Sequence, residues 1–254
     1  MLSHYRLCSY ESIADSRRET VTQDAVSVSC TIDRRPVTLI DTPGFNDKDR
    51  TEVQILRLIS KHLMEKYQEG TKLNGIIFLQ PIVSTSRVTG SEATITRLFK
   101  ALLGRDSFDR VVIAGTHWYN IQNGPPTEAE RQTALKRIAE RTACEELWGD
   151  MVAKGAQAVP YLNTQEDARR IVSVVSGFRA KDILIQKELM AGKSLEETAA
   201  GKELNKQKNE ELALLRDELR ALKSDRDATE MELDQLRRKI EEKDDEIFDL
   251  KRGC

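Results

Sequence analysis

The stretch of sequence that decides the fold is VTLIDTPGFND, residues 37–47. Its first four residues are apolar or β-branched, which is typical of a strand. Asp41 follows that strand directly and precedes the turn-forming pair Pro43-Gly44. Because an open α/β sheet presents its ligand groups at the carboxyl ends of strands, this order predicts a carboxylate delivered to a binding site. The alternative is an ordinary β-turn, since the residue types of Asp41-Thr42-Pro43-Gly44 are also those that turns prefer.

The regions next to this strand predict a hairpin and a helix. Residues 25–32 (AVSVSCTI) form another β-branched run, and the charged turn 33–36 joins them to 37–41, which predicts two antiparallel strands. Apolar residues then recur every three or four positions over 51–69, and Gly70 ends that pattern. This spacing predicts an amphipathic helix.

Further along the chain, short apolar runs alternate with helical stretches. The runs are 75–80, 110–115 and 157–162, and the helical stretches are 91–103, 127–149 and 165–190. Alternation of this kind implies parallel strands joined by crossover helices. The predicted fold is therefore α/β, with a mostly parallel sheet and one antiparallel edge.

The C-terminal part carries a heptad pattern. From Leu212 to Leu250 apolar residues recur in alternating steps of three and four, and Arg226, Thr229 and Lys243 occupy the remaining seam positions. This pattern predicts a long coiled-coil helix. The alternative is a lone solvated helix held by ion pairs four residues apart, which would not explain the leucine spacing. The expected organisation is a poorly defined segment at 1–19, an α/β domain at 20–190, a linker at 191–202 and a coiled coil at 203–252.

Composition excludes several classes of protein. The 40 basic and 42 acidic residues give a formal charge of -2, so nothing in the overall balance favours a nucleic-acid partner. The four cysteines are far apart in the sequence, which argues against a zinc site or a disulfide framework and favours a reducing, cytoplasmic compartment. No apolar run approaches the ~20 residues needed to span a bilayer, so no transmembrane segment is expected.

VTLIDTPGFND, the later VVIAGTHW (residues 111–118) and the heptad tail together resemble the septin-like P-loop GTPases of the avirulence-induced and immunity-associated (GIMAP-type) family, in particular fungal G-domain proteins with such tails. The resemblance covers roughly residues 20 to 250, and the DTPG region carries most of it. It implies GTP or GDP as ligand, Mg²⁺ as cofactor and GTP hydrolysis as the family activity.

The resemblance also implies roles for individual residues near the phosphates. Asp41 would hold Mg²⁺, and the backbone N–H of Gly44 would approach the γ-phosphate because no Cβ intervenes. Thr22 would be the switch threonine that closes over Mg²⁺ and phosphate, with Thr20 as the alternative. Without the resemblance, these threonines would be read as ordinary loop hydroxyls.

At the base, Thr116-His117 would stand where the family usually has N/T-K-x-D. His117 would flank guanine, with Trp118 nearby as an aromatic surface, and Asn163 would lie in the final base-contacting loop. The structural alternatives are that His117 and Trp118 are packing residues and that Asn163 is an N-cap or turn residue.

The chain departs from the family at the phosphate loop. No G-x-x-x-x-G-K-[ST] run precedes Asp41, and Gly192-Lys193-Ser194 follows the last predicted strand instead of the first. We therefore expect an incomplete sheet that lacks its first strand, from a truncated gene model or a degenerate paralogue, and weak or undetectable GTP binding by the chain as written.

Two functions compete at this point. One is a GTP-binding, GTPase-class protein that pairs as a homodimer through its G domain or its coiled coil, and for which the sequence identifies no catalytic residue. The other is a pseudo-GTPase or coiled-coil interaction protein that binds no nucleotide. A Rossmann-like domain without a nucleotide role is a third alternative.

Overall fold

The structure is a computed structural model that describes residues 25–45, 50–82, 90–120, 124–224 and 229–252. Three strands, β3 (Ile76–Pro81), β4 (Val111–Thr116) and β5 (Gln157–Pro160), form a parallel sheet in the order β3-β4-β5. The strands β1 (Val26–Ile32) and β2 (Arg35–Asp41) form an antiparallel pair, as the sequence predicted. The α/β class with a mostly parallel arrangement is therefore confirmed.

The antiparallel pair is a sheet of its own. Within the described ranges β2 is hydrogen-bonded only to β1, and β3 only to β4. Side chains of the pair nevertheless pack into one apolar cluster with Ile77 and Leu79 of β3 and with α5 (Gln165–Ser176). The two sheets are thus joined by side-chain packing and not by a shared backbone ladder.

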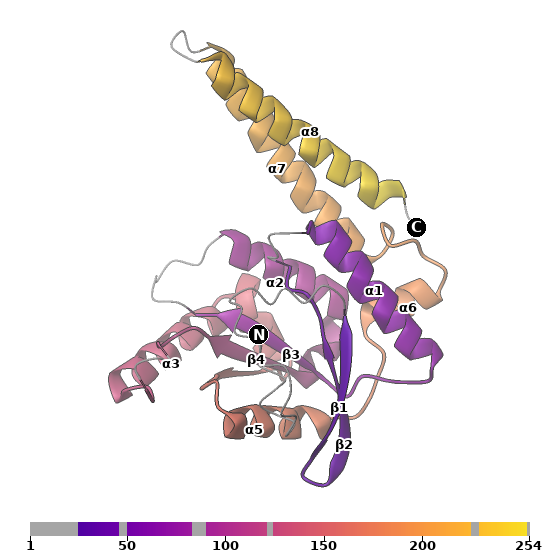
Figure 1. Cartoon of the computed structure of the whole chain (residues 1–254), viewed down its shortest axis with the longest axis vertical. Helices are drawn as coiled ribbons and strands as arrows, with labels where there is room; N and C mark the ends of the chain where they lie inside the picture. The colour runs from indigo at the N-terminus through magenta and orange to yellow at the C-terminus, as the bar shows by residue number, and fades with distance from the viewer. Residues whose placement is uncertain (1–24, 46–49, 83–89, 121–123, 225–228, 253–254) are drawn as a thin grey trace.

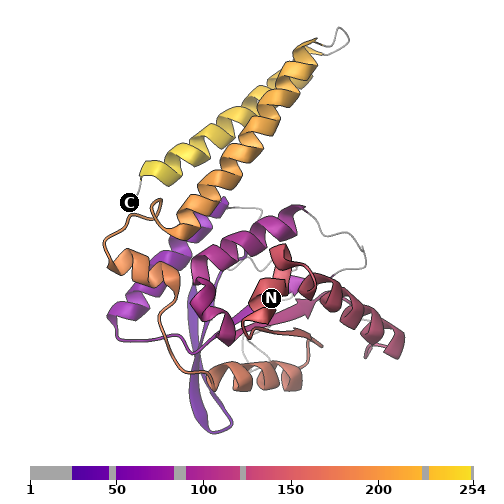
Figure 2. The same ribbon diagram turned by 180° about the vertical axis from the view of Figure 1, so that it is seen from behind.

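The central strand β4 organises the core, since all six of its residues are buried. Val111 and Ile113 belong to a large cluster with α1 (Glu52–Gln68) and α2 (Gly90–Leu103), whereas Val112 and Ala114 belong to the cluster with α5. This alternation follows from the two-residue period of a strand. Figures 1 and 2 show the result, with α1 and α2 on one side of the sheet and α5 on the other.

Several helix ends follow from local sequence. Thr51 begins α1 with a capping box to Gln54, and Thr127 begins α3 (Glu128–Thr142) with a capping box to Glu130. The predicted helix over 127–149 is wrong in its extent, because α3 ends at Thr142 and a π-helical turn (η4, Glu145–Gly149) and a short α4 (Asp150–Ala153) follow.

The predicted helix over 165–190 is likewise two helices. α5 ends at Ser176 with Gly177 as its C-cap, Lys181 then forms a bridge with Leu73, and α6 (Leu184–Met190) follows. A short 3₁₀ helix (η2, Arg105–Arg110) leads from α2 into β4.

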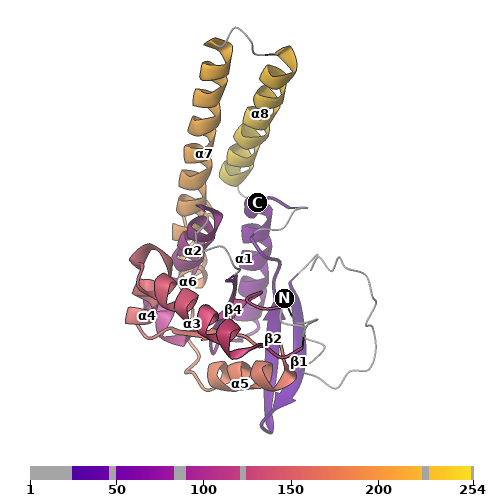
Figure 3. The same ribbon diagram turned by 90° about the vertical axis from the view of Figure 1, so that its left-hand side faces the viewer.

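The long helical C-terminus is present as two helices, α7 (Ala199–Ser224) and α8 (Glu230–Arg252). They lie side by side and project from the α/β body (Figures 1 and 3). Lys208 pairs with Glu246 at 2.8 Å, and Lys243 with Glu211 at 3.3 Å, so the two helices are antiparallel. The chain thus differs from one continuous helix, because the second half of the helical segment packs back on the first.

The predicted seam is the buried side of both helices. Leu212, Leu236, Ile247 and Leu250 are buried, and the remaining apolar seam residues are half-buried. Leu204 and Leu250 join the main core, so the base of this helical hairpin is part of the globular body and α7 begins inside the expected linker at 191–202. No helix in the described part of the chain combines the length and the apolar content needed to cross a bilayer.

Candidate functional site

Two of the expected base-binding positions lie at the carboxyl edge of the parallel sheet. His117 follows the last residue of β4, and Asn163 lies three residues beyond the end of β5, the strand paired with β4. Both have a left-handed backbone, with φ of 57° at His117 and 52° at Asn163. This conformation is uncommon for residues other than glycine and is found in tight turns and at functional sites, although Asn tolerates it best.

Two aromatic side chains fasten the loop after β4 to the loop after β5. The indole Nε1 of Trp118 donates to the carbonyl oxygen of Tyr161 at 2.9 Å, and the hydroxyl of Tyr119 donates to the carbonyl oxygen of Leu162. The rings of Trp118 and Tyr119 contact each other with centroids 4.6 Å apart. These bonds fix the two loops relative to each other.

Trp118 is therefore a packing residue, and the expectation that it offers an aromatic surface to a base is wrong. Its side chain is buried at 6% exposure, and its only polar group is bonded to Tyr161. The physical reason is that the left-handed turn at His117 sends the chain back over the core directly after β4, where a large apolar ring gains most from burial.

A buried carboxylate on α5 binds the backbone of the loop after β5. Asp167, in the first turn of α5, accepts a hydrogen bond from the backbone N–H of Leu162 at 2.8 Å and pairs with Arg170 at 2.6 Å. Its own backbone N–H donates to the hydroxyl of Thr164, the N-cap of α5, at 3.1 Å. Sequence reasoning missed Asp167, although a Thr followed three residues later by an acidic residue is a recognisable helix-start signal.

His117 is exposed and adjoins the last residue of β4. Its Nδ1 lies 2.9 Å from the hydroxyl oxygen of Thr116, a side chain that is itself buried. Although the residue as a whole is exposed, neighbouring protein atoms remove part of the water around its ring, and this partial desolvation lowers the pKa of His117 from its ordinary value. A lowered pKa favours the neutral imidazole, and in the tautomer that carries its proton on Nε2 the Nδ1 accepts a hydrogen bond from the hydroxyl of Thr116.

We expect the Cε1 proton of His117 to titrate by NMR with a midpoint below pH 6.5, its ordinary value. Because the folded state then binds fewer protons than the unfolded chain, this group makes the fold less stable as the pH falls through 6.5. A His117→Gln variant assigns the resonance and should remove that part of the pH dependence. A midpoint at or above 6.5 would contradict the burial argument.

The other half of the expected site lies on the antiparallel pair. Asp41 ends β2 opposite Val26 and is half-buried. Pro43 is buried and Phe45 packs against the main core, which ties the turn to the body. Gly44 is exposed, and a Cβ added there would meet no atom within 4 Å. The site therefore has open space beside the backbone of Gly44.

The predicted site residues are thus divided between two places. Thr116, His117 and Asn163 share the edge of the parallel sheet, whereas Asp41 ends β2 of the other sheet and Gly44 lies in the turn after it. Thr22, and its alternative Thr20, lie outside the described residues. Among the residues that the structure describes, no three His, Cys, Asp or Glu side chains gather as a metal site.

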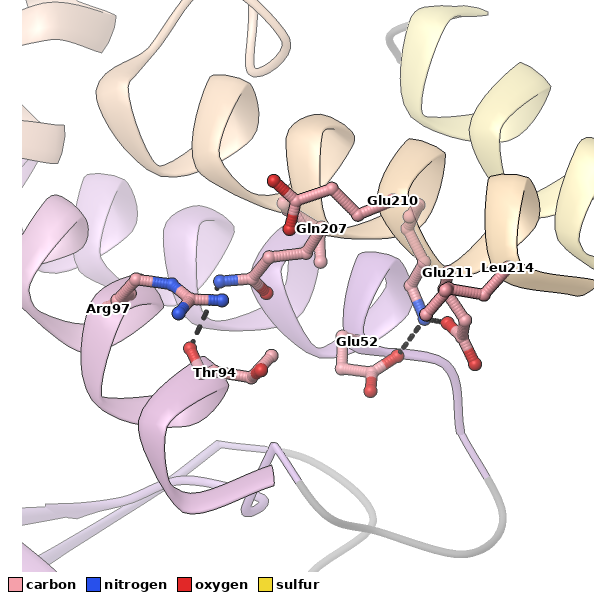
Figure 4. Close-up of a pocket in the computed structure, with 9 residues that line it drawn as sticks. Glu52, Thr94, Arg97, Gln207, Glu210, Glu211 and Leu214 are labelled. Carbon is pink, nitrogen blue, oxygen red and sulfur yellow. Dashed lines mark hydrogen bonds and ion pairs between the residues drawn. The ribbon is translucent and has the colours of Figure 1, made fainter. Parts of the chain in front are cut away.

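A separate groove of 320 Å³ lies where α7 crosses α1 and α2 (Figure 4). Several of the polar side chains that line it are bonded to neighbouring residues. Gln207 donates to the carbonyl oxygen of Thr94 at 3.1 Å, Arg97 pairs with Glu203 at 3.1 Å, and Lys208 pairs with Glu52 at 2.6 Å. This groove is therefore a polar interface between the hairpin and the body.

No family model and no curated protein matches the chain. Among solved structures, one similar chain comes from work on the chloroplast translocon components atToc33 and psToc159, in which dimerization is important for GTPase activity. Its sequence is 14% identical to this chain, the match covers 68% of this chain and 76% of the other, and the TM-score is 0.47. Toc33 from Arabidopsis thaliana, as a dimerization-deficient mutant, is 16% identical, covers 62% of this chain and 71% of its own, and has a TM-score of 0.42.

Proposed function

We propose that this chain is a guanine-nucleotide-binding protein of the P-loop GTPase class, with the base bound at the carboxyl edge of β4 and β5. The observation that carries the proposal is the joined pair of loops after these strands, which presents His117 and Asn163 from left-handed turns. Open α/β sheets bind ligands at this edge. The proposal includes association of two copies through the C-terminal helices and membership of a GTP-hydrolysing class, and it names no residue that positions water.

The residues at the base end suit a purine. A neutral imidazole offers a flat ring on which a base can stack, and the pKa of His117, lowered by burial, keeps it neutral. The side-chain amide of Asn163 carries both a donor and an acceptor, as the edge of guanine requires. The bonds from Trp118 and Tyr119 would keep both groups in place before a ligand arrives.

Asp41 fits the role of a magnesium ligand in this proposal. Mg²⁺ is usually bound by one or two carboxylates together with substrate phosphates, so a single Asp suffices on the protein side. When bound, the ion would neutralise phosphate charge. The open space at Gly44 would let its backbone N–H approach a phosphate oxygen. Thr22 stays the proposed switch residue.

One observation favours the second candidate, a pseudo-GTPase or helical interaction protein without nucleotide. The described residues contain no glycine-rich phosphate loop, and Asp41 is on a sheet that shares no backbone hydrogen bonds with β3. Triphosphate recognition depends largely on such a loop. Under this alternative the edge of β4 and β5 would bind no base.

We expect GTP with Mg²⁺ to shift the NMR signal of His117 at roughly millimolar concentration, which corresponds to about 4 kcal/mol of binding free energy, and ATP to have a much smaller effect. Gly44→Ala should weaken GTP binding about fivefold (~1 kcal/mol, the contribution of one hydrogen bond), because its Cβ would keep a phosphate oxygen away from the backbone N–H. The melting temperature should not change, since that Cβ meets no protein atom within 4 Å. Gly90→Ala is the matched control, because a Cβ there also meets nothing within 4 Å. If GTP leaves His117 unmoved up to several millimolar, the candidate without nucleotide is correct.

A further inference from the structure

The two C-terminal helices carry one uninterrupted heptad phase. Seam positions run from Leu212 to Leu222 in α7 and from Leu233 to Leu250 in α8, and the steps of three and four continue through Arg226 and Thr229 without an insertion. In a hairpin of two helices, the heptad pattern of the first helix need not continue through the connection into the second, because each helix can turn its own apolar side toward the other. A single straight helix needs one phase throughout, because an insertion would rotate the seam away from its partner.

The sequence between the helices is compatible with both forms. Residues 224–229 (SDRDAT) contain neither glycine nor proline, the residues that most often end helices. They do contain a start signal for α8, because the hydroxyl of Thr229 accepts from the backbone N–H of Glu232 at 3.3 Å and the backbone N–H of Thr229 donates to the Glu232 carboxylate at 2.9 Å. This capping box favours the hairpin, whereas the continuous phase favours a straight helix.

The residues of α7 and α1 that contact α8 could contact α8 of a second copy equally well. Within the described residues its ion pairs and hydrogen bonds outside its own helix go to α7 and α1: Glu246 with Lys208, Asp244 with Arg216, and the carbonyl of Asp249 with Arg57. In each of these pairs the α8 residue follows residues 225–228 in the sequence, whereas its partner precedes them. Figure 3 shows that α8 meets the body only at its C-terminal end, beside α1.

The register of the pairs is symmetric about the connection. Lys208 with Glu246 and Glu211 with Lys243 show that each step up α7 is a step back along α8. Both pairs are centred on residue 227, and the same register extended along the helices places Leu219 opposite Gln235, next to Leu236. Two copies with straight helices could pair antiparallel with their centres at residues 225–229. Each residue of α7 would then meet the same residue of α8 as in the hairpin, but from the other copy.

We propose that a second copy of this chain supplies α8. In the dimer, α7 and α8 form one straight helix of about 80 Å, at ~1.5 Å per residue, and each α8 packs on α7 and α1 of the other copy. The proposal rests on the association through the C-terminal helices proposed above and adds its mode. Exchange of an identical element is a low-cost route to a dimer, because the contacts of α8 with α7 and α1 are all made again between the two chains and only the capping box at Thr229 is lost.

Cross-linking distinguishes exchange from other dimers. In the full chain with Cys8, Cys30, Cys144 and Cys254 replaced by serine, Arg216→Cys and Asp244→Cys are introduced together, since this ion pair joins α7 to α8 at 2.8 Å on the surface. Light scattering gives the mass before a short bis-maleimide is added, and denaturing gels show whether the cross-link joins two chains. The two single-cysteine variants are the controls.

We expect a doubled mass and a covalent dimer on the gel. A doubled mass with cross-links only inside each chain would overturn exchange but leave the association standing. A monomer at all concentrations would overturn both. In neither case would the nucleotide proposal be affected, because its test reads His117.

A hinge variant provides the second measurement. Asp227→Pro prevents a straight helix through the connection. We expect it to halve the mass and to move the cross-link inside the chain, with helix content by circular dichroism otherwise unchanged. Thr229→Ala removes the capping box and should raise the dimer fraction. Cross-links between chains that persist in Asp227→Pro would overturn the proposal.

Discussion

Replacing Trp118 by alanine is expected to cost about 3–5 kcal/mol of unfolding free energy, the usual range for a large aromatic residue lost from a core. The ring is 6% exposed, packs in the main cluster and contacts Tyr119. Its loss would also leave the carbonyl oxygen of Tyr161 without the indole donor. Urea unfolding followed by circular dichroism measures the change.

Two milder variants separate packing from hydrogen bonding in this loop. Trp118→Phe keeps most of the ring and loses the bond to Tyr161, so we expect a loss of about 1–3 kcal/mol. Tyr119→Phe removes a hydroxyl from a half-buried side chain and should cost about 0.5–1.5 kcal/mol. If Trp118→Ala is no worse than Tyr119→Phe, the tryptophan does not hold the loop.

Lys208→Met is expected to destabilise the chain by about 2–4 kcal/mol. Only 5% of the Lys208 side chain is exposed, and its Nζ lies 2.6 Å from Glu52 and 2.8 Å from Glu246. Removing one partner of a buried ion pair costs roughly 3–5 kcal/mol because the remaining charge loses its compensation. We place the effect lower because the Glu52 side chain is 36% exposed and keeps part of its hydration.

The control is Lys206→Met, on the same helix. Its side chain is 66% exposed and lies 3.8 Å from Glu210, so its removal should change stability by less than about 0.5 kcal/mol. Equal melting temperatures for the two variants would show that Lys208 does not join α1, α7 and α8.

The pH dependence of the difference between wild type and Lys208→Met follows from the shifted groups. Burial opposes the charge on Lys208, but hydrogen bonds from its ammonium to Glu246 and Glu52 outweigh burial and raise its pKa. Burial also opposes the charge on Glu52, and the bond from Lys208 outweighs it and lowers the pKa of Glu52. The advantage of wild type should therefore hold near neutral pH, shrink as the pH falls from 4.5, the ordinary pKa of Glu52, through the lowered pKa that Glu52 has in the fold, and shrink again as the pH rises above 10.5, the ordinary pKa of Lys208.

Sequence periodicity located most of the elements. The expected strand at 110–115 is β4 at 111–116, and the expected helix at 51–69 is α1 at 52–68. The extents of two helices were predicted wrongly: α5 ends at Ser176 with Gly177 as its C-cap, and the chain then forms a bridge between Leu73 and Lys181, a contact between segments that the local pattern does not encode. For the candidate site, the family resemblance assigned Thr116, His117 and Asn163 to one base, and the structure brings their loops together at the carboxyl edge of the parallel sheet. The sequence left open whether Trp118 faces a base or packs in the core, and the structure shows that it is buried.

The sequence by itself determined the local features of this protein: strands with a two-residue period, helices begun by Thr51 and Thr127, and a seam of leucines at heptad spacing. Each depends on contacts within a few residues, which composition and spacing encode. Only the tertiary structure decided what covers the seam and how the site is divided. A seam specifies apolar surface but not which helix buries it, and a strand end specifies a carboxylate but not which sheet carries it, because both depend on packing between segments far apart in the chain.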